Sequence, residues 1–94
     1  MKHHIIVKWT EEVTDKAALA AEVTALYASA GEIPGVSHAE IIPNVINRPN
    51  RYDLMIVVHM EKVALSAWDS SDLHHHWKDH YGHLVGAKTI FDCE

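Results

Sequence analysis

Two runs of this chain are apolar on both sides of an extended backbone, and this feature limits the possible folds most strongly. Residues 3–9 and 52–60 are rich in β-branched and aromatic residues, which favour strands. Successive side chains of a strand point to opposite faces, so His3, Ile5 and Val7 share one face and Ile6 lies on the other. Because both faces carry apolar residues, both must be covered.

The segments between and after these runs predict the helices that cover one face. Residues 14–30 contain neither Gly nor Pro, repeat apolar side chains at helical spacing and precede Gly31. We expect a further strand at 36–42, a short helix at 61–68, another helix from 72 to about 83, and a last strand at 87–91. This order is that of an α+β, ferredoxin-like split βαβ fold. It predicts a four-stranded antiparallel sheet with helices on one face, in a single domain spanning 1–94.

The other face of such a sheet has no helix to cover it. A bare apolar sheet face is a patch that soluble monomers seldom tolerate. Two sheets packed face to face would remove it, so the strand pattern predicts a homodimer. His59 shares its strand face with Met55 and Val57 and is expected to lie in this interface.

Charge and cysteine content narrow the expected partners and the compartment. The chain has 8 Lys and Arg against 13 Asp and Glu, which gives a formal net charge of -5 and no basic field for nucleic acid or anionic lipid. No apolar run is long enough for a membrane span, and we expect a cytoplasmic protein. Cys93 is the single cysteine, so no internal disulfide can form. No flavin, nicotinamide or phosphate-binding loop is present, and no cofactor is expected.

Nine histidines are the unusual feature of the composition, and His74 is the best candidate to face a pocket. At about 100° per residue, Leu73, Trp77 and Tyr81 form the buried stripe of their helix, and His74 lies at its edge. An imidazole with a pKa near 6.5 can act as a general base at neutral pH. The alternative for His74 is a boundary residue that bonds a carbonyl and packs against Trp77.

Two other groups of histidines give different expectations. His76, His80 and His83 have i, i+4, i+7 spacing, which could bind a divalent ion. A solvated helix face has the same composition and no orienting partner is evident, so no metal site is predicted. His3 lies on an apolar strand face, where it is predicted to be a polar group of a ligand pocket.

Several short segments carry a resemblance to a known family. The segments are 2–5, 32–36, 52–54 and 91–92, together with Trp68 followed six residues later by His74. In this order and spacing the chain resembles the stress-responsive dimeric A/B barrel (Dabb) domain family over nearly its whole length. The resemblance implies a homodimer whose two sheets form an α/β barrel, with a cavity between each sheet and its own helices.

One plant branch of that family is a polyketide cyclase with a tyrosine and a histidine in the cavity. By resemblance its histidine corresponds to His74, and a first-strand pocket histidine corresponds to His3. The tyrosine position is Trp68 here, a second pocket histidine position is Leu54, and the family's His-Pro pair reads Ser71-Asp72.

The predicted function is therefore that of a homodimer which binds a small, partly apolar or aromatic molecule. Catalysis, if present, would be cofactor-free proton transfer of the cyclase, lyase or isomerase kind. A non-enzymatic stress or ligand-binding protein and a cofactor-independent monooxygenase are the alternatives, and oxygen uptake with a quinol would identify the latter. The expected base is His74, and the expected ligand-binding residues are His3, Leu54, Trp68, Trp77 and Tyr81.

Overall fold

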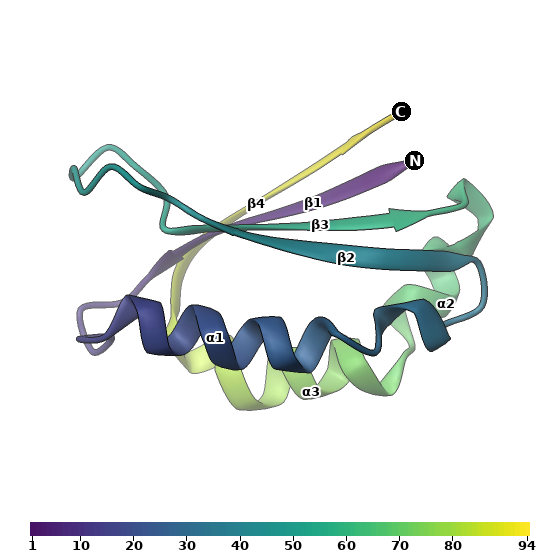
Figure 1. Ribbon diagram of the computed structural model, residues 1–94, viewed down its shortest axis with the longest axis horizontal. Helices are drawn as coiled ribbons and strands as arrows, with labels where there is room; N and C mark the ends of the chain where they lie inside the picture. Colours follow the sequence, from purple (N-terminus) through teal and green to yellow (C-terminus); the bar gives the residue numbers. More distant parts are fainter.

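The run of residues 3–9 forms the strand β1 (Lys2–Trp9), which lies inside a four-stranded sheet of order β2-β3-β1-β4. The computed structural model describes residues 1–94 (Figure 1). All neighbouring strands are antiparallel. The ferredoxin-like plan predicted from the sequence is confirmed. The other strands are β2 (Val36–Pro43), β3 (Leu54–Met60) and β4 (Val85–Cys93).

Three helices cover one face of the sheet (Figure 1). They are α1 (Lys16–Tyr27), α2 (Leu65–Asp69) and α3 (Asp72–Tyr81), and none is long and apolar enough to cross a membrane. Single 3-10 turns extend this layer: η1 (Ala30–Glu32), η2 (Lys62–Ala64) and η3 (Gly82–Leu84).

Element boundaries differ from the expected ones where side chains intervene. The helix expected over 14–30 begins at Lys16, because Asp15 caps it: the Asp15 carboxylate accepts a hydrogen bond of 2.9 Å from the N–H of Ala18. β3 begins at Leu54 instead of residue 52, because the Asp53 carboxylate accepts the N–H of Trp9 that a longer strand would have paired. The expected helix at 61–68 is divided into η2 and α2.

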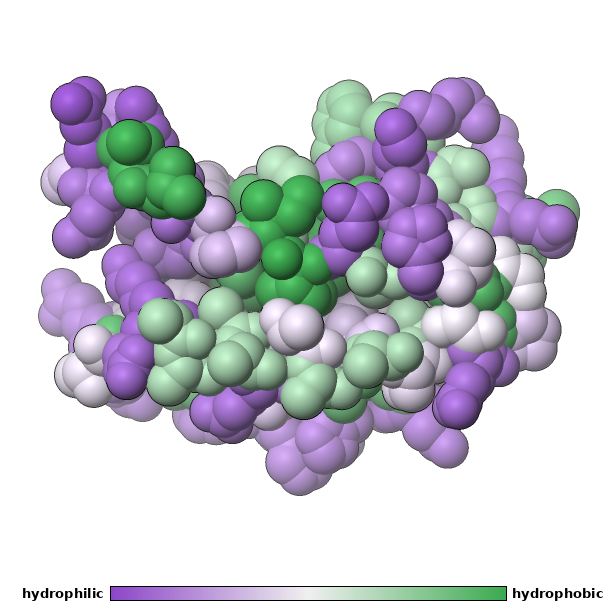
Figure 2. Space-filling view, in the orientation of Figure 1, coloured by the Kyte–Doolittle hydropathy of each residue, from purple (hydrophilic) through white to green (hydrophobic).

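The alternation of the strands separates a covered face from an open one. On the covered face, Ile5, Val7, Ile56 and Val58 are at most 1% exposed. On the open face, strand pairing places Phe91 of β4 beside His4 of β1, and Phe91 is 60% exposed. The loop between β2 and β3 also exposes apolar residues, visible at the upper left of Figure 2; Val45 is 90% exposed.

Candidate functional site

Trp68 of α2 is the centre of an aromatic cluster between the helices and the sheet. Its side chain is completely buried. The ring centroid of Trp68 lies 5.3 Å from that of His74 on α3, 5.8 Å from that of Tyr27 on α1, and 6.4 Å from that of His3 on β1. Thus four elements contribute to what we call the Trp68 cluster: His3, Tyr27, Trp68 and His74.

Ser71 sets the position of His74. Its hydroxyl accepts the His74 N–H at 3.1 Å, as the N-cap of α3, and donates to the carbonyl of Trp68 at 2.7 Å. The two bonds fix the turn that joins α2 to α3. The Ser71-Asp72 pair, which departs from the family's His-Pro, therefore has a structural role that holds His74 against Trp68.

His3 forms a carboxylate–imidazole pair with the last strand. It is 6% exposed, and its Nδ1 lies 2.6 Å from Oδ1 of Asp92, its register partner on β4. A carboxylate at Nδ1 holds the proton on that nitrogen and leaves Nε2 as the acceptor. The contact with Asp92 thus fixes the orientation of the His3 ring.

Three polar atoms of the Trp68 cluster are buried without a hydrogen-bond partner in the protein. They are the Tyr27 hydroxyl, Nε1 of Trp68 and Nδ1 of His74. More than about 90% of buried polar groups in proteins have a partner. Here three unpaired atoms lie on Trp68 and on the two rings that pack against it. An incoming polar group would be stabilised by pairing with them.

Burial also sets the protonation of the cluster. Burial lowers the pKa of His74 below its ordinary value; Asp69 opposes this shift, while Lys78 and Lys88 reinforce it. Burial raises the pKa of the Tyr27 phenol well above its ordinary range. At neutral pH, His74 is therefore a neutral imidazole that can accept a proton, and Tyr27 is a hydrogen-bond donor.

Two further predicted ligand residues, Trp77 and Tyr81, extend the aromatic packing from Tyr27 along α3. Trp77 is buried between Trp9 and Tyr27, with ring centroids at 6.1 and 6.0 Å. Tyr81 stacks on Trp77, and its hydroxyl donates to Glu22 of α1 at 3.4 Å. The pKa of Tyr81 is raised, first by burial and then by Glu22.

Leu54 lies at the other end of the sheet from His3. Leu54 pairs with Val7 of β1, four residues or about 13 Å along the strand from His3. It lines a cleft of about 460 Å³ between α1 and the loop that joins β2 to β3.

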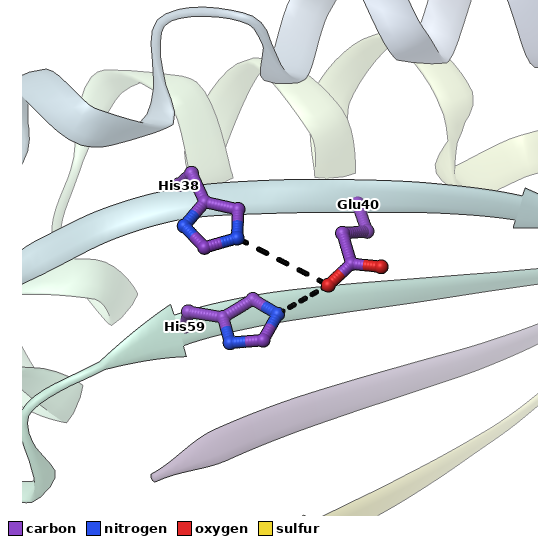
Figure 3. A group of neighbouring side chains, drawn as sticks. All are labelled: His38, Glu40 and His59. Atoms are coloured by element: carbon purple, nitrogen blue, oxygen red, sulfur yellow. Dashed lines mark hydrogen bonds and ion pairs between the residues drawn. The ribbon is translucent and has the colours of Figure 1, made fainter.

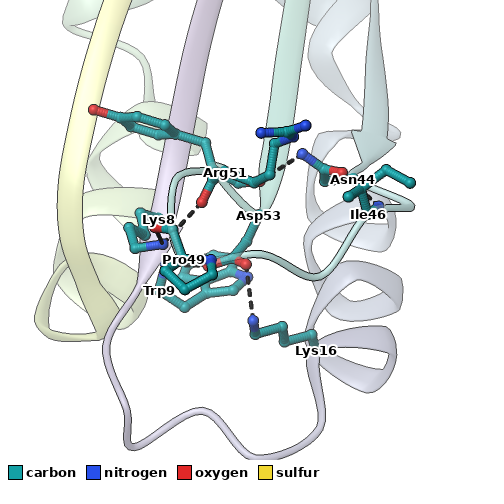
Figure 4. Close-up of polar contacts among 9 residues, drawn as sticks. Lys8, Trp9, Lys16, Asn44, Ile46, Pro49, Arg51 and Asp53 are labelled. Atoms are coloured by element: carbon teal, nitrogen blue, oxygen red, sulfur yellow. Dashed lines mark hydrogen bonds and ion pairs between the residues drawn. The ribbon is translucent and has the colours of Figure 1, made fainter.

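Polar contacts hold that loop against β1 (Figure 4). The Asp53 carboxylate accepts from the Trp9 N–H at 2.8 Å and from Lys16 Nζ at 2.9 Å, and Lys8 Nζ donates to the carbonyl of Arg51 at 2.8 Å. Burial raises the pKa of Asp53, but the hydrogen bonds from Lys16 and Trp9 together lower it by more. The pKa of Asp53 is therefore below its ordinary value. Asp53 is thus a charged structural anchor.

Sequence reasoning missed two residues of the site. Tyr27 falls within the apolar repeat of residues 14–30, and spacing alone does not show that its hydroxyl lacks a partner. Asp92 stood in a segment that carried the family resemblance, but its contact with His3 depends on the register between β1 and β4.

Comparison with known proteins supports the fold. No protein-family model and no curated protein sequence matches the chain. A dimeric, ferredoxin-like protein of unknown function from Bacteroides fragilis superimposes with a TM-score of 0.80 at 13% identity, over 99% of this chain and 93% of that one. A dabb family protein from Mesorhizobium loti superimposes with a TM-score of 0.65 at 14% identity, over 99% of this chain and 93% of that protein. The hydroxynitrile lyase of Passiflora edulis superimposes with a TM-score of 0.71 at 7% identity, over 96% of this chain and 87% of the lyase. At these identities the likeness shows a shared ferredoxin-like fold.

Proposed function

We propose that the chain is a cytoplasmic homodimer of the dimeric A/B barrel family, assembled through the open face of its sheet. Support comes from similar structures that are themselves dimeric and from the dabb family protein among them. The open face also carries Phe91 and Ile42, which are 60% and 45% exposed in the single chain. A second sheet packed on this face would bury both side chains.

The ligand of this homodimer is a small, partly apolar molecule with an aromatic ring and at least one polar group. The observation that carries this proposal is the set of three unpaired polar atoms on Tyr27, Trp68 and His74. An aromatic ligand fits the rings of the cluster, and its polar group fits their donors. Binding there requires side chains to move aside, because Trp68 is completely buried in the single chain.

Proton transfer by His74 is the chemistry that this arrangement favours. With its proton on Nε2, the neutral imidazole of His74 has a base at Nδ1, the buried atom. Nδ1 would take a proton from a substrate hydroxyl or acidic C–H, while the donors of Tyr27 and Trp68 stabilise the oxygen that gains negative charge. A cofactor-free lyase, cyclase or isomerase would work in this way, and a lyase of the same fold is known.

The test is substitution of His74, with a neighbour as the control. Phenolic and polyketide-like compounds are first screened by quenching of tryptophan fluorescence. His74→Asn is then expected to keep the dimer and to lower turnover of a substrate by roughly a hundredfold or more, the usual effect of a lost general base. His75→Asn, at an exposed position of the same helix, should change nothing. If His74→Asn unfolds early and leaves ligand affinity unchanged, His74 is structural and non-enzymatic binding is the better account.

A further inference from the structure

A second histidine cluster lies on the open face of the sheet, away from the Trp68 cluster. His38 of β2 and His59 of β3 are cross-strand partners, and Glu40 lies two residues beyond His38 on the same face (Figure 3). The two imidazoles stack with centroids 4.2 Å apart and an interplanar angle of 11°. Glu40 Oε1 lies 2.5 Å from Nε2 of His59 and 4.0 Å from Nε2 of His38.

A local irregularity of β2 orients this group. Val36 pairs with Met60 and His38 with His59, so Ser37 is one extra residue in its strand. The Ser37 hydroxyl donates to the carbonyl of His59 at 3.3 Å, and it lies 2.9 Å from Nδ1 of His38. Because a hydroxyl has one proton to donate, it accepts from Nδ1–H of His38. The lone pair of His38 is thereby on Nε2, on the side of Glu40.

We propose that His38, Glu40 and His59 bind a divalent transition-metal ion such as Zn²⁺. One ligand atom from each residue lies within 4.8 Å of the other two. In tetrahedral zinc sites with bonds of about 2.0 to 2.2 Å, ligand atoms stand roughly 3.3 Å apart. The distances of 2.5 and 4.0 Å from Glu40 Oε1 lie on either side of that value. Nε2–H of His59 donates to Glu40 in the metal-free chain, so an ion takes the place of this proton, and the two stacked rings turn until both Nε2 atoms face it.

The donor set selects the class of ion. Two imidazole nitrogens and one carboxylate oxygen suit zinc, copper or nickel, whereas magnesium and calcium prefer oxygen ligands alone. Ser37 supplies the outer contact that fixes the tautomer of a metal-binding histidine. In the single chain the side chains of His38, Glu40 and His59 are 59%, 49% and 23% exposed, so an ion can reach them before a second sheet packs on this face.

The site does not depend on the proposed ligand or on catalysis, but it shares the open face with the proposed dimer interface. All three ligands come from one chain, and β2 is an edge strand, so the site lies at the rim of the open face. It also differs from the histidines of α3 that the sequence analysis singled out. There, His76 and His80 stack with centroids 3.8 Å apart, and His83 lies beyond the helix end in η3.

The experiment is calorimetric titration of the chelator-treated chain of 94 residues with ZnCl₂. We expect one zinc per chain in the wild type. His59→Ala and the isosteric Glu40→Gln should weaken affinity about a hundredfold, and Ser37→Ala about tenfold, since outer contacts contribute roughly 10- to 100-fold. The double variant His76→Ala, His80→Ala is the control and should bind as the wild type does. Cobalt substitution should give the absorption bands of a four-coordinate site.

Three results would overturn the proposal. One is a wild-type chain that binds no zinc at concentrations up to about 100 µM, because a site that needs more zinc than this is too weak to be specific. Another is zinc binding that survives Glu40→Gln and His59→Ala unchanged. The third is loss of binding in the double variant of α3, which would move the site to His76 and His80. Circular dichroism of each variant separates loss of the site from loss of the fold.

Discussion

Replacing Tyr27 with Phe removes a buried hydroxyl without a partner, and we expect the variant to be more stable than the wild type. Tyr27 is 2% exposed. An unpaired buried polar group costs about 1 to 3 kcal/mol. The ring contacts with Trp68 and Trp77, at 5.8 and 6.0 Å, remain in the variant. The free energy of unfolding should therefore rise by about 1 to 2 kcal/mol, and Tm by about 4 to 8 °C for each kcal/mol.

The assay is urea unfolding followed by circular dichroism, with equal protomer concentrations because dimerisation makes stability depend on concentration. Tyr81→Phe is the matched control. Its hydroxyl donates to Glu22 at 3.4 Å at an exposed position on the helical side of the chain, so its removal should change stability by less than about 0.5 kcal/mol.

A loss of stability in Tyr27→Phe would refute this reasoning. It would mean that the hydroxyl has a partner in the native state and is not kept unpaired for a ligand. A gain in stability together with weaker binding of any ligand found by screening would give the opposite conclusion: the chain retains a destabilising group because binding needs it.

Further predictions concern assembly, protonation and the backbone. Phe91→Glu should sediment as a folded 10.6 kDa chain and the wild type at twice that mass, while Val63→Glu, at a site 87% exposed off the sheet, should stay dimeric. The lowered pKa of His74 means that the unfolded state takes up a proton that the folded state resists. The free energy of unfolding should therefore fall as the pH drops below about 6.5, and this fall should be smaller in His74→Gln. Urea titrations at pH values from about 8 to about 5 measure it. Gly35 has φ +81°, and a Cβ there would lie 2.7 Å from a side-chain atom, so Gly35→Ala should lose about 1 to 3 kcal/mol. A Cβ at Gly82 would meet open space, so Gly82→Ala should lose no stability. Urea unfolding of both variants measures the difference.

Periodicity predicted the sheet and its two faces because it is a local property. His3 and Ile5 alternate with Ile6 as a strand requires, and the buried face of β1 follows this alternation. The stripe of Leu73 and Trp77 on α3 was predicted for the same reason.

Contacts between elements could not be predicted in the same way. Helical spacing alone placed His74 one turn before Trp77, and the family resemblance placed it in a pocket with Trp68; the turn capped by Ser71 brings its ring against Trp68. The convergence of His38 and Glu40 with His59 needs one extra residue in β2, which shifts the register and leaves no signal in hydrophobic periodicity.

The pairing of β1 with β4 bears on how the chain folds during synthesis. The bond between His3 and Asp92 joins residues 89 positions apart. Ribosomes add about 5 to 20 residues per second, so His3 waits roughly 4 to 18 seconds for Asp92 to be made. Throughout that time one edge of β1 has no partner strand, and an open edge is a template for pairing with other chains. Folding of this sheet is therefore completed late, and the nascent chain is the stage most exposed to mispairing between neighbours on a polysome.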